Sequence, residues 1–253
     1  MSVLPSILAT RHLGLDIGGA TIVTDVSLEV REGEFLGIIG PNGAGKTSLF
    51  NLLSGLYRPT AGTVSLDGRD ITHDAPYRRT QAGLGRTFQI SSVFPRLSAL
   101  ENVRLAAEAK IGGMLRFWRQ ASHVRTAVDR ARWALGRVGL GASEQVAAGS
   151  LAHGDKRKLE LAMLLALDPR VILLDEPMAG VSTADVPQLA EVIKAVQIEE
   201  RKTVLMVEHH IEVVTGLAER IAVMHHGALL ACDTPAKVME NETVQAAYVG
   251  DAL

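Results

Sequence analysis

Short, nearly uninterrupted apolar runs are the clearest pattern along the chain. They occur at residues 34–40, 171–176 and 203–208, with the sequences EFLGIIG, VILLDE and TVLMVE. Runs of this length are typical of strands that are buried on both faces of a parallel sheet. The three runs therefore predict the core of a mostly parallel β-sheet.

Other segments predict strands of a different kind. Residues 7–30 alternate loosely between apolar and polar positions, and residues 63–68 (TVSLDG) have the pattern of a strand followed by a turn. Residues 220–232 predict a hairpin that turns at His226-Gly227. We expect an antiparallel β part near the N-terminus.

Helical periodicity dominates the middle of the chain. Apolar residues recur at helical spacing within residues 98–109 and 123–139, and residues 112–119 predict a loop or a short amphipathic piece between them. The predicted fold class is therefore α/β, with one domain over residues 1–253. We expect a core with the β part at about 7–90 and 166–253, and a helical subdomain at about 91–165.

Composition excludes several classes of protein. The chain has 253 residues and a net charge of −2, so no overall positive charge favours nucleic acid as a partner. Cys232 is the only cysteine, which excludes an internal disulfide and fits a reducing compartment. The N-terminus lacks the pattern of a signal peptide, and no apolar stretch is long enough to span a bilayer. A cytoplasmic protein is expected.

A glycine-rich segment carries the clearest chemistry. Residues 40–47 read GPNGAGKT and match the pattern G-x-x-x-x-G-K-[ST] between a predicted strand and a predicted helix. Backbone N–H groups of such a loop converge on phosphate, and the following helix adds its positive end. We expect Lys46 to reach the β- and γ-phosphates and the Thr47 hydroxyl to bind Mg²⁺. The residues expected to hold ATP here are Gly40, Pro41, Asn42, Gly43, Ala44, Gly45, Lys46, Thr47 and Ser48.

Two acids end the predicted strand at residues 171–176. Asp175 is placed to bind the Mg²⁺ shell, and Glu176 is placed to polarise the water that attacks the γ-phosphate. An acidic turn without function is the alternative for such a strand end taken alone. Its pairing with the phosphate loop favours the catalytic interpretation.

Several short motifs follow the phosphate loop in a fixed order: FQ (88–89), LAHGD (151–155), VILLDE and VEHH (207–210). In this order, over residues 7–250, the chain resembles the ATP-binding cassette (ABC) ATPases. The resemblance implies that Gln89 contacts Mg²⁺ and the attacking water and couples to a membrane partner; a solvated glutamine at a strand end is the alternative. It also implies that a histidine contacts the γ-phosphate, and we prefer His209 to His210 because His209 directly follows the acidic residue that ends the strand.

Cassettes of this family work as head-to-tail dimers. The resemblance therefore implies that Ala152, His153 and Gly154 face the nucleotide of a second cassette through backbone N–H groups at a helix N-terminus. The basic residues 156–158 either add positive field there or form a solvated face.

The chain departs from the usual family pattern at three places. Ala152 stands where a serine is usual and Asp155 where a glutamine is usual. Ile17 is aligned with the aromatic residue that usually stacks on adenine, and Ser182 stands at a position where the family usually has an acidic residue. These departures put the strength of catalysis across the dimer in doubt, while nucleotide binding is still expected.

The departures also indicate a branch of the family. The chain is similar here to ATPase subunits of branched-chain amino acid uptake systems and of urea and short-amide importers. The features that carry this similarity are GRTFQ (85–89), the long segment at 108–125, the start Leu-Ala-x-Gly at 151–154, MAGVS (178–182) and the ending AYVGDAL. The resemblance implies ATP and Mg²⁺ as cofactors, an identical or different second cassette, a separate permease and a periplasmic solute-binding protein. It places the protein peripherally on the cytoplasmic face of the inner membrane. A soluble non-transport ABC ATPase and a catalytically weak nucleotide-binding module are the alternatives.

Overall fold

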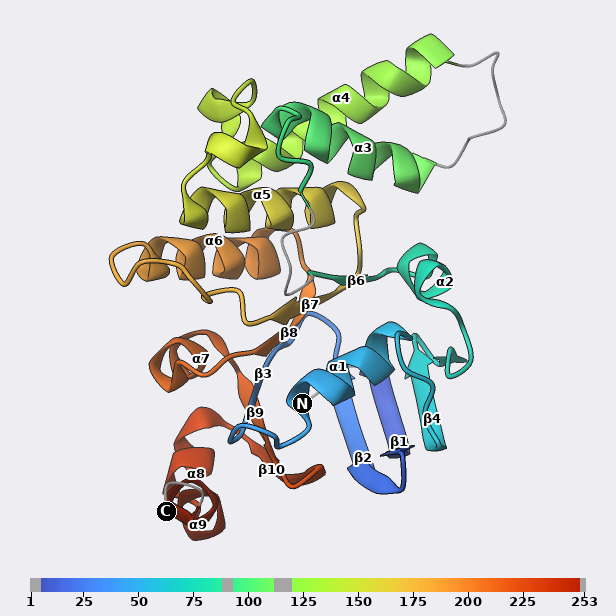
Figure 1. Cartoon of the computed structure of the whole chain (residues 1–253), viewed down its shortest axis with the longest axis vertical. Helices are drawn as coiled ribbons and strands as arrows, with labels where there is room; N and C mark the ends of the chain where they lie inside the picture. Colours follow the sequence, from blue (N-terminus) through green and yellow to red (C-terminus); the bar gives the residue numbers. More distant parts are fainter. Residues whose placement is uncertain (1–5, 88–92, 112–119, 251–253) are drawn as a thin grey trace. The chain divides into compact units, whose positions relative to one another are not determined.

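A computed structural model describes residues 6–87, 93–111 and 120–250, and it divides the chain into two compact units. The first unit contains residues 1–86, 170–176 and 197–253, and the second contains 87–169 and 177–196. Figure 1 shows the elements of each unit along the chain. Gln89 and the predicted loop at 112–119 lie outside the described residues.

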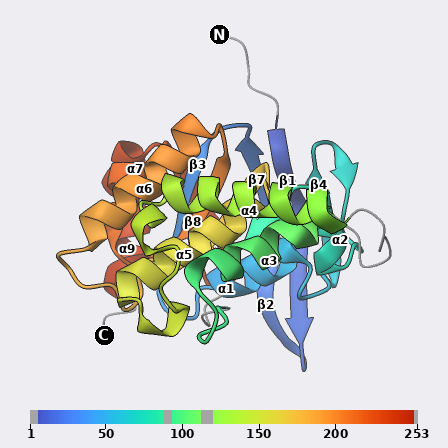
Figure 2. The ribbon, with the colours of Figure 1, turned by 90° about the horizontal axis from the view of Figure 1, so that it is seen from above.

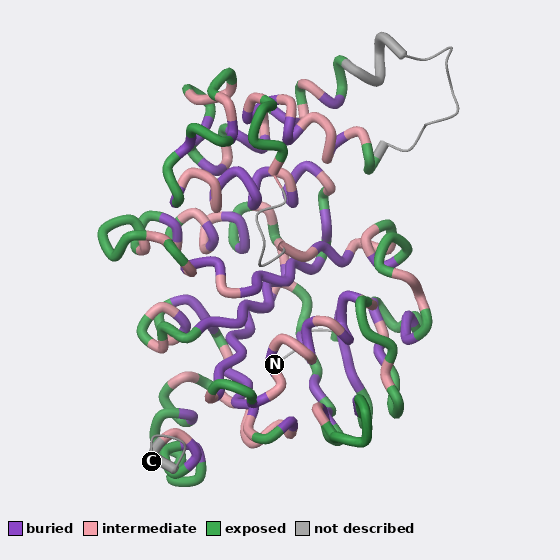
Figure 3. Tube along the Cα trace, in the orientation of Figure 1, coloured by how far each residue is buried: buried purple, intermediate pink, exposed green. Residues whose placement is uncertain are grey.

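A six-stranded sheet forms the centre of the first unit. Its strand order is β10-β9-β3-β8-β7-β6, in which all neighbours are parallel except the hairpin of β9 and β10. The strands are β3 (Phe35–Ile39), β6 (Leu84–Arg86), β7 (Val171–Asp175), β8 (Thr203–Val207), β9 (Arg220–His225) and β10 (Ala228–Asp233). Every residue of β3, β7 and β8 is buried, as their continuous apolar sequences predict (Figure 3).

A four-stranded antiparallel sheet forms the rest of the β structure, in the order β2-β1-β4-β5. Its strands are β1 (Ser6–Ile17), β2 (Ala20–Arg31), β4 (Ala61–Leu66) and β5 (Arg69–Asp70). Buried and exposed residues alternate in the second half of β2, which is the pattern of a sheet with one wet face. The predicted fold class, with a mostly parallel core sheet and an N-terminal antiparallel part, is confirmed.

Five helices of the first unit flank these sheets. They are α1 (Lys46–Ser54), α2 (Pro76–Gln81), α7 (Ile211–Leu217), α8 (Pro235–Glu240) and α9 (Glu242–Gly250). The core joins α1 to both sheets, because Leu49, Phe50 and Leu53 are at most 1% exposed within the same apolar cluster as Leu36 and Val64. This packing fixes the helix that follows the phosphate loop.

The second unit is mainly helical. It contains α3 (Ala99–Ile111), α4 (Gln120–Arg137), α5 (His153–Ala166) and the start of α6 (Val186–Glu199), together with short 3₁₀ turns at Gly141–Ser143 and Ala148–Ser150. Figure 2 shows α3 and α4 side by side, and both contact α5. Ala127, Ala131 and Ala134 of α4 are fully buried, and their small size allows close helix packing.

Across 6–87, 93–111 and 120–250, no helix is both long enough and apolar enough to cross a bilayer.

A buried arginine closes the C-terminal end of α1. Arg79 of α2 is 1% exposed and donates hydrogen bonds to the carbonyl oxygens of Leu52 and Leu53, both at 2.7 Å. Its other nitrogens bond the carbonyl oxygens of Thr72 and Asp74. The guanidinium thus satisfies helix-end carbonyls that have no intrahelical partner.

We predict that Arg79→Met lowers the free energy of unfolding by about 2–4 kcal/mol, because several buried carbonyls lose their donor. Urea unfolding followed by circular dichroism measures this change. The neighbouring Arg78 is exposed, so Arg78→Met is the matched control and should change the stability by less than about 0.5 kcal/mol. Equal effects of the two substitutions would contradict the assignment.

Candidate nucleotide site

The phosphate loop joins β3 to α1. Gly43 and Gly45 have φ values of +78° and +94°, a left-handed conformation that glycine adopts without strain. A side chain at Gly45 would also stand 3.0 Å from the carbonyl oxygen of Ile22. Since α1 begins at Lys46, the N–H groups of its first turn have no intrahelical acceptor and can bind an anion.

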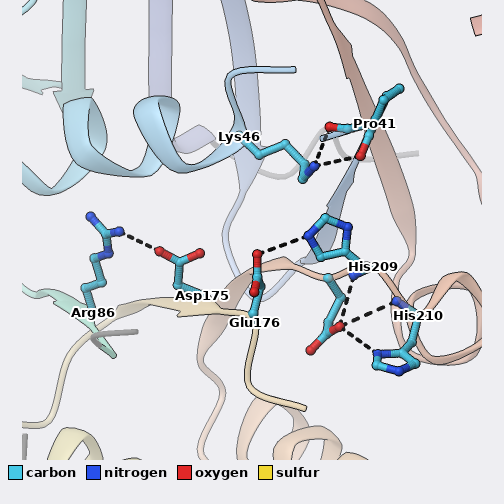
Figure 4. A network of polar contacts seen from close by, with 9 residues as sticks. Pro41, Lys46, Arg86, Asp175, Glu176, His209 and His210 are labelled. Atoms are coloured by element: carbon cyan, nitrogen blue, oxygen red, sulfur yellow. Dashed lines mark hydrogen bonds and ion pairs between the residues drawn. The ribbon is translucent and has the colours of Figure 1, made fainter. Parts of the chain in front are cut away.

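Lys46 points its ammonium back over this loop. Its Nζ donates to the carbonyl oxygens of Gly40 at 2.6 Å and Pro41 at 2.8 Å (Figure 4). Burial lowers the pKa of the Lys46 ammonium below its ordinary value, and the negative charges of Glu176 and Asp175 partly offset this effect. A buried cation is therefore held close to two carboxylates.

Neighbouring segments hold the loop in place. The N–H of Gly227, in the turn between β9 and β10, donates to the carbonyl oxygen of Ala44 at 3.1 Å. Tyr248 of α9 approaches the other end of the loop: burial raises the pKa of its hydroxyl to about 12, an effect that a hydrogen bond from the Gly40 backbone partly opposes. The C-terminal helix is thus in contact with the start of the phosphate loop.

Asp175 and Glu176 lie at the carboxyl end of β7, as the sequence predicts. The side chain of Asp175 is fully buried, and that of Glu176 is 25% exposed. Glu176 has a φ of +47° and its N–H donates to the carbonyl oxygen of Val207 in β8. A left-handed conformation is uncommon for glutamate and costs free energy, which the surrounding structure must offset.

The two histidines after β8 have different partners. His209 Nε2 lies 3.1 Å from Glu176 Oε1, whereas His210 Nδ1 lies 3.1 Å from Glu208 Oε2 (Figure 4). Glu208 is 2% exposed and also accepts a hydrogen bond from the backbone N–H of His209 at 3.0 Å. Of the two rings, only that of His209 contacts the acid expected to act on water.

Sequence reasoning missed two residues at this site. Arg86, the last residue of β6, donates from Nη2 to Asp175 Oδ2 at 2.6 Å. The sequence identifies Glu208 only as the acid that ends a strand. In the structure its carboxylate accepts a hydrogen bond from the His209 N–H and contacts the ring of His210. Neither role has a local sequence signal.

Oxygen donors at this site fit Mg²⁺. A hydroxyl (Thr47) in the first turn of α1 and a carboxylate (Asp175) at the end of β7 are ligands that this ion prefers. Among the described residues, no group of three or more His, Cys, Asp or Glu side chains could hold a metal ion. Thr47 and Asp175 are the residues whose chemistry fits Mg²⁺, an ion that is usually bound through one or two carboxylates and substrate phosphates.

The remaining predicted site residues belong to other elements of the fold. Ile17 ends β1 and is 50% exposed. In the second unit, α5 begins at His153 with Ala152 as its N-cap residue, so His153 and Gly154 form the first helical turn. The His153 ring packs on Gly180. A Cβ atom added at Gly180 would lie 3.1 Å from Cε1 of this ring, so the contact requires glycine or a small shift of the ring.

The basic residues that follow Gly154 mostly have partners within the second unit. Arg157 pairs with Glu160 at 2.9 Å, and Lys158 donates to Gln188 at 3.0 Å and lies 3.3 Å from Asp155. Ion pairs of this kind neutralise most of the charge. A solvated basic face is therefore wrong for Arg157 and Lys158, which are at most 12% exposed in their side chains.

Comparison with known sequences identifies relatives over nearly the whole chain. Residues 23–179 match the family described as ABC transporter. The chain is 37% identical to the high-affinity branched-chain amino acid transport ATP-binding protein LivG of Salmonella typhimurium, over 97% of this chain and 98% of LivG. It is 35% identical, with the same coverage, to the corresponding protein BraF of Pseudomonas aeruginosa. It is also 35% identical to the lipopolysaccharide export system ATP-binding protein LptB of Acidithiobacillus ferridurans, over 91% of each chain.

Solved structures agree with this result. A nucleotide-free ATP-binding cassette from an ABC transporter matches with a TM-score of 0.85 and 26% identity, over 96% of this chain and 99% of that chain. The ADP conformation of MJ1267, an ATP-binding cassette of an ABC transporter, matches with a TM-score of 0.82 and 26% identity, over 97% and 99%. Identity of this extent, over a shared fold and nearly full length, reflects common descent, and the protein therefore belongs to the ABC transporter family as one of its ATP-binding cassettes.

Proposed function

We propose that this protein is the ATP-hydrolysing subunit of an importer for branched-chain amino acids or a related small polar solute. The observation that carries this proposal is the full-length similarity to LivG and BraF, whose names describe branched-chain amino acid transport. The arrangement of Lys46, Glu176 and His209 supports the hydrolytic part.

ATP binds through the phosphate loop in this proposal. The Lys46 ammonium exchanges its two carbonyl acceptors for phosphate oxygens, which are stronger acceptors because they are charged. The first-turn N–H groups of α1 bind the same phosphates. Ile17 offers the adenine ring an exposed aliphatic surface in place of an aromatic one.

Glu176 acts on the attacking water. Its carboxylate is partly exposed and ends a buried strand, so it can accept a hydrogen bond from a water aimed at the γ-phosphate. His209 holds this carboxylate through Nε2 and is itself fixed by Glu208. We assign His209, not His210, the contact with the γ-phosphate.

Mg²⁺ is held by Thr47 and Asp175 in this proposal, with Gln89 as a further predicted ligand outside the described residues. The ion supplies neutralisation of the negative charge on the β- and γ-phosphates when it is bound. Asp175 is fully buried, so its carboxylate keeps one orientation toward the nucleotide.

A second cassette completes the site. The dimeric structure of MJ0796, a bacterial ABC transporter cassette, matches this chain with a TM-score of 0.76 and 26% identity. We infer an identical or a different partner cassette that presents Ala152, His153 and Gly154 to the nucleotide. Ala152 has no hydroxyl, and the first-turn N–H groups of α5 bind the phosphate instead.

The permease contact is assigned to the loop before α3. Phe94 and Leu97 are 55% and 36% exposed, which is unusual for large apolar side chains near each other. The fully buried Asn102 fixes this loop, since its side chain accepts from the Phe94 N–H at 2.7 Å and donates to the Phe94 and Ser98 carbonyls. A hydrogen-bonded loop that exposes two large apolar side chains beside Arg96 suits docking to permease subunits at the cytoplasmic face of the inner membrane, with a periplasmic solute-binding protein beyond them.

We predict that His209→Ala lowers the ATPase rate at least tenfold and that His210→Ala leaves it within about twofold. The difference is expected because the ring of His209 contacts Glu176 whereas the ring of His210 contacts Glu208. A catalytic contact typically contributes about 10²–10⁴ in rate. Steady-state phosphate release from the purified cassette, with its partner cassette if the dimer is mixed, measures both rates. A larger loss in His210→Ala would reverse the assignment.

Replacement of Glu176 by glutamine should separate binding from hydrolysis. Glu176→Gln keeps the shape of the side chain but removes its basicity, so turnover should fall by about 10²–10⁴. ATP binding should persist, because Lys46 and the loop are intact, and the ATP-bound dimer should accumulate. Light scattering with Mg-ATP detects that dimer, with ADP and Lys46→Ala as controls. A near-normal rate of hydrolysis would exclude Glu176 as the base.

Uptake by cells tests the transported solute. Deletion of the gene should abolish high-affinity uptake of labelled leucine, isoleucine or a short amide, and the wild-type gene should restore it while the Lys46→Ala variant should not. Normal uptake of all of them would contradict the import proposal. If lipopolysaccharide instead fails to reach the cell surface in the deletion strain, the function named in LptB would replace the one proposed here.

A further inference from the structure

Arg86 connects three elements around the nucleotide site. Its side chain is 8% exposed, and its guanidinium forms an ion pair with the fully buried Asp175 of β7. The other end of the guanidinium donates from Nη1 to Asn51 Oδ1 at 2.7 Å and to Ser54 Oγ at 2.9 Å, both on α1. Figure 4 shows Arg86 directed at the Asp175 carboxylate.

We propose that Arg86 is a positioning residue that fixes the Asp175 carboxylate relative to Thr47. Arg86 Nη2 donates a hydrogen bond to Asp175 Oδ2, which holds the carboxylate in one orientation. In that orientation the other carboxylate oxygen is offered to Mg²⁺. This inference rests on the proposed function, since it concerns the metal that accompanies the nucleotide.

The spacing of the anchors on α1 supports this role. Asn51 and Ser54 are four and seven residues after Thr47, a spacing that places all three on one face of a helix. Arg86 therefore links Asp175 to the helix face that carries the expected metal-binding hydroxyl. Through this link, the position of α1 sets the distance between the two oxygen ligands.

The shape of the guanidinium explains why arginine is present. Its planar fork makes hydrogen bonds in two directions at once, which the single ammonium of a lysine cannot reproduce. The Arg86 Cζ also lies 5.7 Å from the centre of the buried Phe50 ring, and this packing limits rotation of the side chain.

A simple charge-compensating role makes the opposite prediction. If Arg86 only neutralises Asp175, its removal leaves a more negative site, and Mg²⁺ should bind more tightly. If Arg86 positions the carboxylate, its removal should weaken Mg²⁺, as the loss of outer-shell partners of metal ligands does. The sign of the change distinguishes the two roles.

The affinity of ADP for the full chain, measured in Mg²⁺ and again in EDTA, provides the test. The ratio of the two dissociation constants reports the coupling between metal and nucleotide, and ADP avoids any contribution from hydrolysis. We expect Arg86→Met to lower this Mg²⁺ enhancement about 10–100-fold relative to wild type, with the affinity in EDTA little changed. Arg86→Lys should give a smaller loss in the same direction.

Two further variants control for folding and helix packing. Arg79→Met removes a different buried arginine, one on α2 that contacts the end of α1, and lowers stability. It should leave the Mg²⁺ enhancement unchanged, because the hydrogen bonds of Arg79 go to backbone carbonyls. Asn51→Ala keeps both charges and removes one anchor, and should lower the enhancement about 2–10-fold.

Several outcomes would overturn the proposal. An unchanged or increased Mg²⁺ enhancement in the folded Arg86 variants would do so, and so would an equal loss in Arg79→Met. If neither Arg86 variant folds, Asn51→Ala decides, and an unchanged enhancement there overturns the role. If wild type binds no ADP, or Lys46→Ala binds it equally well, the proposed nucleotide function fails first and this inference fails with it.

Discussion

A buried ammonium held between a glycine loop and two carboxylates is the interaction on which the site depends. Lys46 loses hydration on burial, which lowers its pKa, and the Gly40 and Pro41 carbonyls and the charges of Asp175 and Glu176 partly offset that loss. Such an arrangement is costly without a strongly charged ligand, because a partly compensated buried charge is unfavourable. In the proposed function, the charged phosphate oxygens of the nucleotide replace the two carbonyls as acceptors of the Lys46 ammonium.

Parallel strands bring the opposing groups to this point. β3 leads into the phosphate loop, while β7 and β8 end in Asp175-Glu176 and Glu208-His209, and the three strands are neighbours in the order β3-β8-β7. Carboxyl ends of parallel strands share one edge of a sheet, which is where such folds bind ligands. All residues of β3, β7 and β8 are buried, and this packing fixes the positions of the residues at the carboxyl ends of the three strands.

Supporting residues then orient the groups that react. Arg86 holds the Asp175 carboxylate, and Glu208 holds the backbone N–H of His209. Arg79 plays a structural part at the far end of α1.

Local patterns in the sequence determined the strands, the phosphate loop and the family. The phosphate-binding loop at 40–47 is formed by residues adjacent in the sequence, so its motif can be recognised locally. The apolar runs at 171–176 and 203–208 indicate buried strands by their composition alone. The α/β class and the resemblance to ABC ATPases could be predicted for that reason, and both are confirmed. The order of the six strands required the three-dimensional structure, since it depends on connections that pass through distant parts of the chain.

Tertiary structure alone decided the partners of the charged groups. In the sequence, His209 differs from His210 only in directly following an acidic residue. The contact of His209 with Glu176, 33 residues away, is visible only in the fold. Arg86 meets partners 35, 32 and 89 residues distant, a pairing with no periodic signal. Hydrophobic spacing repeats along a chain and can be recognised in the sequence, whereas a single long-range ion pair exists only after the core has brought its two ends together.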